Sequence, residues 1–223
     1  MELMHTSHVP AGEGPFPTIF ALHGWGANAH DLLGLAPHLH GGRALVLCPQ
    51  GPVPVPVGDG MVGYGWFPLG GGREVDPDDF EKGGLLLRSF VEEAFERFPI
   101  DRRKVVVMGF SQGGVMAYDL VLRNPEVFAA LVALSSWLPE DVAARVADKG
   151  ETGLAALPAL VMHGTQDPMI PVDRARDSRD RLIRLGVSPA YHEYEMGHEI
   201  HPEALRTMVQ WLEEKVLTPV MVA

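Results

Sequence analysis

The fold of this chain is decided by the stretch Val105-Val106-Val107-Met108-Gly109-Phe110-Ser111-Gln112-Gly113-Gly114. A run of β-branched apolar residues predicts a buried strand that stops at Gly109, and a helical pattern begins just after Ser111. Gly109-x-Ser111-x-Gly113 has the form of a nucleophile elbow, a tight strand-to-helix turn whose glycines leave room for close neighbours. Ser111 would stand at a helix N-terminus, where backbone N–H groups favour an anion. The simpler explanation is an ordinary Gly/Ser turn, because G-x-S-x-G also occurs by chance.

The size and composition of the chain fit one α/β domain spanning residues 1–223. Of its 223 residues 46% are hydrophobic, which is enough for a large core. Lys plus Arg number 18 and Asp plus Glu number 29, and the resulting net charge of −11 argues against nucleic acid and anionic membranes as partners. The single cysteine, Cys48, allows no intrachain disulfide and reads as a buried thiol. Because we find no signal peptide and no membrane-spanning run, we expect a cytoplasmic protein.

Short apolar runs alternate with amphipathic segments along the chain. The continuous apolar runs predict a mostly parallel sheet with helices on both faces. In such a sheet, ligands bind beyond the carboxyl ends of the strands. The motifs HGWG, GFSQGG, HGTQDP and MGHE each follow an apolar run, so we expect them at one edge. Strands are expected near residues 18–22, 44–48, 105–108, 128–134, 157–162 and 190–194, and helices near 31–39, 79–98, 112–123, 141–148, 172–185 and from 202.

Four segments do not fit this alternation. Residues 1–16 are polar and form either a short edge strand or a loose arm. Residues 49–78 contain six prolines together with aromatic residues, so we expect an ordered substrate-binding loop there. The segment after Leu134 is too short for a separate cap domain. The apolar tail at 218–223 could pack on the domain or on a partner, which leaves a homodimer possible.

A serine hydroxyl becomes a nucleophile only when a base removes its proton, and a carboxylate then orients the base. Among the ten histidines we choose His198, which lies on a turn just past the last strand. Asp167 follows a strand and is our choice of carboxylate, although Asp-Pro alone is an ordinary turn. The chain order Ser111, Asp167, His198 is that of an α/β-hydrolase triad. Asp141 is the alternative acid.

The tetrahedral intermediate of acyl transfer needs two N–H donors. One is expected from Gln112, directly after the serine, and the other from Trp25 in the HGWG turn. His198-Glu199-Ile200-His201 has one residue too few between its histidines for a zinc motif, and Pro202 breaks the helix which that motif requires. We therefore expect neither a metal nor a cofactor.

These motifs together resemble the phospholipase/carboxylesterase family, the acyl-protein thioesterase-like group of small α/β-hydrolases. The resemblance covers about residues 17–215 and implies an α/β-hydrolase fold without a cap domain. It also implies the triad Ser111, Asp167 and His198. The residues that carry it are Leu22-His23-Gly24-Trp25-Gly26, Gly109-Phe110-Ser111-Gln112-Gly113-Gly114, His163-Gly164-Thr165-Gln166-Asp167-Pro168-Met169-Ile170-Pro171 and Met196-Gly197-His198-Glu199.

The resemblance also bears on the substrate. The N–H groups of Trp25 and Gln112 would form the oxyanion hole, and Trp25 stands where family members commonly have leucine. Trp66-Phe67 resembles the aromatic pair of the loop that walls the family's acyl site, so we expect Trp25, Trp66, Phe67 and Met169 to contact the substrate. The implied activity is that of a serine carboxylesterase acting on small esters of short to medium acyl chain. The alternatives are a thioesterase or lysophospholipase with the same triad, or a catalytically silent binding protein.

Overall fold

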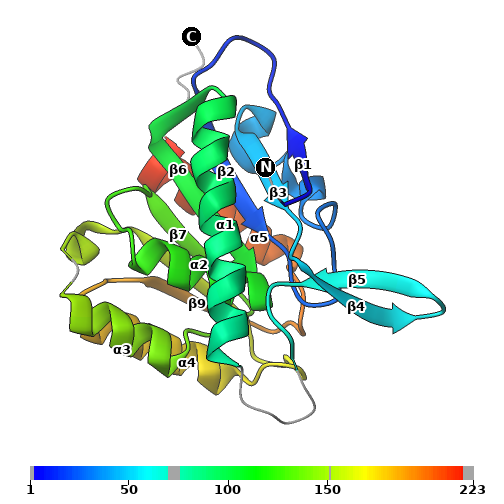
Figure 1. Cartoon of the computed structure of the whole chain (residues 1–223). Helices are drawn as coiled ribbons and strands as arrows, with labels where there is room; N and C mark the ends of the chain where they lie inside the picture. The colour runs from blue at the N-terminus through cyan, green and yellow to red at the C-terminus, as the bar shows by residue number, and fades with distance from the viewer. Residues whose placement is uncertain (1–2, 70–75, 151, 218–223) are drawn as a thin grey trace.

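The computed structural model describes residues 3–69, 76–150 and 152–217, which leaves the predicted tail at 218–223 outside the described residues. Its centre is a seven-stranded sheet with the strand order β1-β3-β2-β6-β7-β8-β9 (Figure 1). β1 runs antiparallel to β3, and all other neighbours are parallel. The strands are β1 His5–His8, β2 Phe16–Leu22, β3 Leu45–Pro49, β6 Ile100–Phe110, β7 Ala130–Leu134, β8 Ala159–Gly164 and β9 Ala190–Tyr194.

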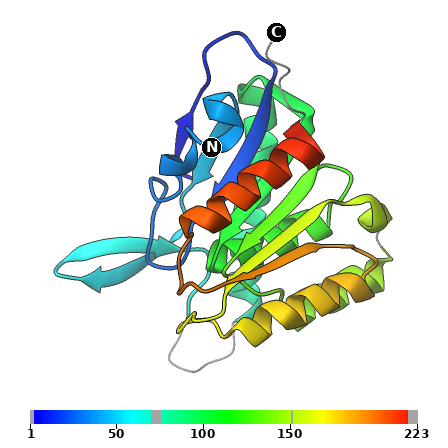
Figure 2. The same cartoon turned by 180° about the vertical axis from the view of Figure 1, so that it is seen from behind.

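Helices cover both faces of the sheet. The first four pack on one face and α5 packs on the other, as the front and back views show (Figures 1 and 2). The architecture is the predicted α/β-hydrolase fold, with a mainly parallel sheet between two helical layers. The helices are α1 Pro77–Arg97, α2 Gln112–Leu122, α3 Glu140–Lys149, α4 Val172–Arg184 and α5 Pro202–Leu212, which continues as a π-helical turn at Glu213–Leu217.

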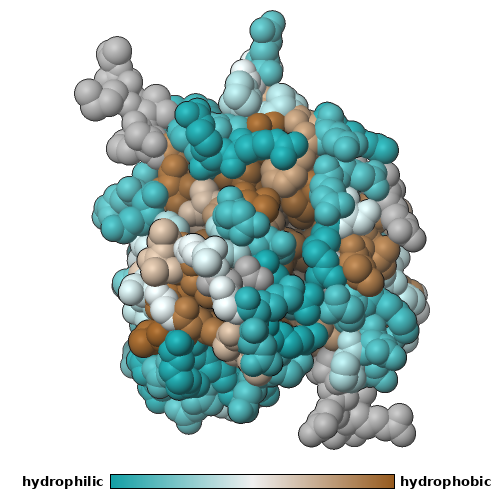
Figure 3. Space-filling view, turned by 60° about the vertical axis from the view of Figure 1, so that its left-hand side comes forward, coloured by the Kyte–Doolittle hydropathy of each residue, from teal (hydrophilic) through white to brown (hydrophobic). Residues whose placement is uncertain are grey.

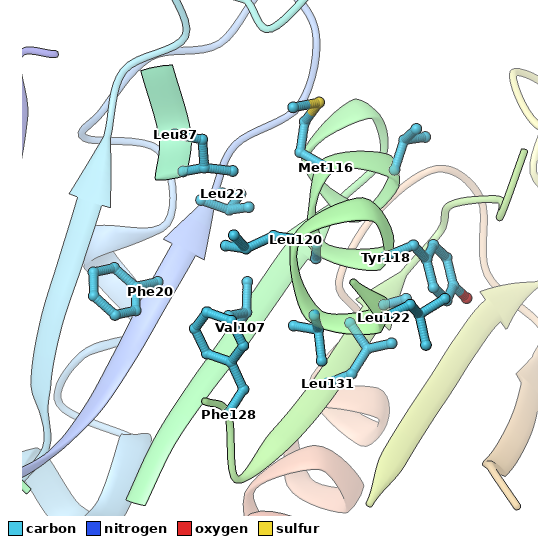
Figure 4. Packing of buried hydrophobic residues seen from close by; sticks show 14 of the residues in the cluster. Phe20, Leu22, Leu87, Val107, Met116, Tyr118, Leu120, Leu122, Phe128 and Leu131 are labelled. Atoms are coloured by element: carbon cyan, nitrogen blue, oxygen red, sulfur yellow. The ribbon is translucent and has the colours of Figure 1, made fainter. Parts of the chain in front are cut away.

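Alternation along the strands divides the core into two layers. In β6, Val105 and Val107 point to the layer under α1 and α2, whereas Val106 and Met108 point to the layer under α5. All four side chains are fully buried. Figure 4 shows Val107 and Leu131 packed beneath α2. Because both faces of β6 are covered at residues 105–108, that part of the strand is a continuous apolar run and could be recognised, whereas its charged beginning at residues 101–104 was not expected.

The order in which the chain adds strands to the sheet reverses at β2. The chain places β3 on one side of β2 and then β6 on the other, so the carboxyl ends of β2 and β6 adjoin at a topological switch point. A Cβ atom on Gly24 would lie 3.2 Å from the Cβ of Ser111, so the turns after these two strands touch. This edge of the sheet positions the candidate site.

Two expected irregular segments have regular structure. Residues 5–8 form an edge strand, which is the first of the two alternatives proposed for the N-terminal segment. The segment 49–78 is not a simple loop, because it contains a β-hairpin of β4, Val53–Gly58, and β5, Met61–Gly65. The hairpin projects from the body of the protein (Figures 1 and 2).

The helix expected at 31–39 is wrong. Two short 3₁₀ helices at Leu33–Leu35 and Leu39–Gly42 take its place. Pro37 lies inside the expected range and interrupts a continuous helix there, and the second short element is irregular, because His40 and Gly41 within it have left-handed φ values of 52° and 58°. Between β7 and β8 the described residues form only α3 and a 3₁₀ turn at Leu154–Ala156, with no cap domain.

The surface is mixed in character. On the face shown in Figure 3, hydrophobic side chains lie in patches and hollows between hydrophilic ones. Cys48 is a free, buried thiol as predicted, and burial raises its pKa to about 12. Among the described residues, we find no helix long and apolar enough to cross a membrane.

Candidate active site

Ser111 occupies the turn between β6 and α2 with a strained backbone. Its φ and ψ are 53° and −121°, a region that residues with a side chain rarely adopt. Two contacts hold it there. The Ser111 N–H donates to the carbonyl of Leu134 (2.9 Å), and the Ser136 hydroxyl donates to the carbonyl of Ser111 (2.7 Å). The end of β7 therefore fixes the turn that follows β6.

The glycines around Ser111 allow this turn to be tight. A Cβ atom on Gly109 would collide with the carbonyl of Gly113, and one on Gly113 would collide with the carbonyl of Leu22. These contacts are with backbone atoms, which cannot move aside as a flexible side chain could. The motif Gly109-x-Ser111-x-Gly113 thus has the close-packed geometry expected of a nucleophile elbow.

Asp167 and His198 meet across the carboxyl edge of the sheet. The Nδ1–H of His198 donates to Oδ2 of Asp167 at 2.7 Å. The other oxygen, Oδ1, accepts the backbone N–H groups of Met169 (2.8 Å) and Ile170 (2.9 Å). Asp167 follows β8 and His198 follows β9, so two parallel strands deliver the pair. The carboxylate is held in a position that orients the imidazole.

The surroundings of Asp167 favour its charged form. Burial by itself would raise the pKa of this carboxyl, but the hydrogen bonds from His198, Ile170 and Met169 outweigh it and hold the pKa below its ordinary value. His163 lies beside it, with Nε2 3.5 Å from Asp167 Oδ2 and 2.8 Å from the carbonyl of Ile170. Burial lowers the pKa of His163. It is therefore a neutral structural histidine.

Ser111 and His198 line one cavity of about 280 Å³. The phenyl ring of Phe110 lies against the imidazole of His198, with 4.8 Å between ring centroids. Asp141, the alternative acid, instead pairs with Arg145 at 2.6 Å on α3. The structure thus brings the three predicted triad residues together. The other lining residues are Gly24, Trp25, Ala27, Asp31, Leu69, Gln112, Trp137, Met169, Ile170, Pro171 and Arg174.

The two expected oxyanion donors also lie at this cavity. Gln112 is the first residue of α2, so its N–H belongs to the turn whose donors have no partner inside the helix. Trp25 lines the cavity from the turn after β2. The hairpin fixes that turn, because Gly26 N–H donates to the Tyr64 carbonyl (2.9 Å) and Tyr64 N–H donates to the Ala27 carbonyl (2.7 Å). Hence β5 supports the predicted oxyanion loop.

The four residues predicted to contact the substrate differ in whether they line the cavity. Trp25 and Met169 line the cavity, and Met169 is 71% exposed at its rim. Phe67 lines an adjoining cavity of about 760 Å³. Trp66 is fully buried and lies behind the predicted oxyanion loop, where its indole N–H donates to the His23 carbonyl (2.9 Å). Trp66 therefore supports this loop from behind and does not form part of a cavity wall.

Sequence reasoning missed the supporting role of the Gln112 side chain. The amide of Gln112, which is fully buried, accepts from Trp66 N–H and donates to the Phe67 carbonyl, both at 2.7 Å. The imidazole of His23 contacts the Gly24 carbonyl through Nδ1 (2.7 Å) and accepts the Gly51 N–H at Nε2 (2.9 Å). Both residues lie within the motifs HGWG and GFSQGG, but the partners of the Gln112 amide are distant in the sequence and leave no local signal.

A model of the family described as Phospholipase/Carboxylesterase matches residues 7–216 of this chain. The chain belongs to that family. The resemblance drawn from its motifs is confirmed, and with it the class of activity. As a member of the phospholipase/carboxylesterase family, it is a hydrolase of the esterase or thioesterase type.

Individual proteins resemble the chain over nearly its whole length. Acyl-protein thioesterase 1 of Gibberella zeae is 26% identical over 221 residues, covering 93% of this chain and 94% of that protein. Esterase PE8 is 25% identical with a TM-score of 0.80, covering 97% of this chain and all of the other. A carboxylesterase of Bacillus cereus has the same fold, with 22% identity, a TM-score of 0.78 and coverages of 96% and 95%.

Proposed function

We propose that this protein is a serine carboxylesterase that hydrolyses esters of short to medium acyl chain. One observation carries the proposal. The Asp167–His198 hydrogen bond of 2.7 Å lies at the edge of a cavity that the strained Ser111 also lines. A serine, an imidazole and a carboxylate in these positions are the parts of an acyl-transfer site.

The proposed reaction proceeds in two halves. Ser111 Oγ attacks the ester carbonyl while Nε2 of His198 takes its proton, and Asp167 stabilises the imidazolium. The N–H groups of Gln112 and Trp25 stabilise the oxyanion. His198 then gives the proton to the departing alcohol, and the acyl group stays on Ser111. In the second half His198 activates a water molecule, which releases the carboxylic acid and restores the serine.

The size of the site supports the choice of substrate. A cavity of about 280 Å³ accommodates a small ester, and its walls are largely aromatic and aliphatic. A second candidate is thioester hydrolysis by the same residues, favoured because relatives of the chain are named acyl-protein thioesterase 1. A comparison of kcat/KM for oxygen esters and thioesters of equal acyl chain, over a series of chain lengths, distinguishes the two.

A fluorophosphonate probe tests the nucleophile directly. We expect wild-type protein to be labelled at Ser111, and Ser111→Ala to lose both labelling and ester turnover. Ser89→Ala is the matched control, because Ser89 lies on α1 outside the cavity and its loss should change neither readout. Ester turnover by a folded Ser111→Ala protein would refute the proposal. Failure of folded wild-type protein to react or turn over would favour a catalytically silent binding protein.

A further inference from the structure

Arg174 is placed to act on whatever occupies the candidate site. It lies in the first turn of α4 and lines the cavity that contains Ser111 and His198. It also lines the adjoining cavity of about 760 Å³, with Trp137 and Leu69 shared between the two. Arg174 is therefore one of the three residues that the two cavities share.

The contacts of Arg174 leave its hydrogen-bond donors unused. Its guanidinium carbon lies 4.8 Å from the ring centroid of Trp137, which is a cation–π contact and not a hydrogen bond. Within the described ranges, no side-chain hydrogen bond or ion pair is formed by Arg174. The N–H groups along its edge can thus form the fork that binds a carboxylate with two parallel hydrogen bonds.

Three of the other four arginines of α4 differ from Arg174 in this respect. Arg176 binds Glu193 (2.8 Å) and Asp173 (2.9 Å), and Arg181 donates to the Leu138 carbonyl (2.6 Å). Arg179 likewise pairs with its neighbouring aspartate. Arg174 lines the cavity without forming an ion pair among the described residues, which points to a partner that arrives from solution.

The electrostatic surroundings of Arg174 favour an incoming anion. Burial and the nearby positive charge of Arg181 lower the pKa of Arg174, and the carboxylate of Asp177 opposes this only in part. The group stays charged at neutral pH, and a negative substrate group would compensate it. Asp31 also lines this cavity, so the charged residues of its wall are one arginine and one aspartate. This balance suits a singly charged carboxylate better than a phosphate dianion.

We propose that Arg174 selects esters that carry a carboxylate group on the acyl or the alcohol part. The inference rests on the proposed esterase function and names the substrate class for that site. It predicts a preference for anionic over neutral esters, although the protein itself carries a net charge of −11. Local charge at the cavity decides this preference, since the field of distant surface charges is screened at physiological salt.

Two matched pairs of esters test the inference. The acyl pair is mono-p-nitrophenyl adipate against p-nitrophenyl hexanoate, and the alcohol pair is meta-acetoxybenzoate against meta-acetoxybenzamide. For each protein, the readout is the ratio of kcat/KM for the anionic ester to that for its neutral partner. The proteins are wild type, Arg174→Gln, Arg174→Lys and Asp31→Asn. Arg184→Gln is the control, because it removes the same charge from the last turn of α4, away from the cavity.

In at least one pair we expect the ratio to fall about tenfold in Arg174→Gln, which is the size of a lost charge-assisted hydrogen bond. Arg174→Lys should restore part of the ratio, Asp31→Asn should raise it, and Arg184→Gln should leave it unchanged. Ratios that are equal in wild type and Arg174→Gln for both pairs would overturn the inference while leaving the esterase proposal intact. If wild type turns over none of the four esters, or Ser111→Ala turns them over equally well, both proposals fail.

Discussion

The side-chain amide of Gln112 joins the turn after Ser111 to Trp66 of the segment after the hairpin. Its Oε1 accepts a hydrogen bond from the Trp66 backbone N–H, and its Nε2 donates to the carbonyl of Phe67, each at 2.7 Å. The same residue lines the cavity, where its backbone N–H is predicted to stabilise an oxyanion. Gln112 therefore couples the predicted oxyanion donor to the loop behind it, through a bond pair that is buried from water.

Replacement of Gln112 by alanine should weaken both stability and turnover. It leaves the Trp66 N–H and the Phe67 carbonyl without a partner in the interior, at a cost of about 1–3 kcal/mol for each group. We expect the free energy of unfolding in urea to fall by at least the cost of one such group. We also expect a larger change in kcat, which should fall, than in KM. Gln210→Ala is the control, since Gln210 bonds only to the exposed Glu214 on the surface. A Gln112→Ala protein as stable and active as that control would contradict the coupling.

Gly63 should tolerate no side chain. A Cβ atom there would collide with the carbonyl of Gly26 in the predicted oxyanion loop. Gly63→Ala is thus expected to cost about 1–3 kcal/mol of stability and to lower kcat, because the loop must shift. Gly34→Ala is the comparison, since a Cβ atom at Gly34 meets nothing within 4 Å. Equal melting temperatures and equal kcat for the two variants would show that the hairpin does not position the loop.

His23 should make the protein less stable in mild acid. Burial lowers its pKa below the ordinary value of 6.5, so at a pH between these two values the unfolded chain binds the proton and the folded chain does not. The stability from neutral His23 is complete above about pH 6.5 and decreases as the pH falls toward the folded pKa, by at most about 1.4 kcal/mol per pH unit. His23→Gln cannot titrate. The difference in unfolding free energy between wild type and His23→Gln should therefore shrink from pH 7 to pH 5, and a constant difference would contradict this account.

Two aspartate–arginine contacts should differ in energy because they differ in burial. Asp119 is 2% exposed and contacts Arg123 (3.1 Å) and Arg88 (3.5 Å), so its loss leaves two cations without their buried partner. Asp119→Ala should cost about 3 kcal/mol or more. Asp141, which is 66% exposed, pairs with Arg145, and Asp141→Ala should cost less than about 1 kcal/mol. Denaturant unfolding of both variants measures the difference, and similar losses would refute the distinction.

The parts of the fold that follow from local pattern could be predicted from the sequence. A stretch of strand that is covered on both faces must be continuously apolar, and this pattern revealed β6. In a parallel sheet, the turns that bind ligands follow the carboxyl ends of such strands. That rule brought Ser111, Asp167 and His198 to one edge without any knowledge of their distances. The residues lie far apart along the chain, but parallel strands all end on the same side.

The hairpin could not be predicted, because its prolines hide the strand pattern. Pro54 lies opposite Tyr64 in the ladder, but the N–H and carbonyl of Tyr64 bond to Ala27 and Gly26 on the other side. An N–H at Pro54 is therefore not needed for pairing. Trp66 was misjudged for a related reason. An indole can face a substrate or the interior, and the partner that decided the matter, the carbonyl of His23, lies far away in the sequence.

The backbone conformation of Ser111 lowers the stability of the fold, although the proposed turnover requires a serine at this position. A φ of 53° with a ψ of −121° costs a residue with a side chain on the order of 1–3 kcal/mol, which glycine would not incur. Ser111→Gly should accordingly unfold at a higher denaturant concentration than Ser111→Ala, which keeps the strain, although both lack the hydroxyl. If the serine is the nucleophile, selection for turnover maintains at this one position a residue that selection for stability alone would have discarded.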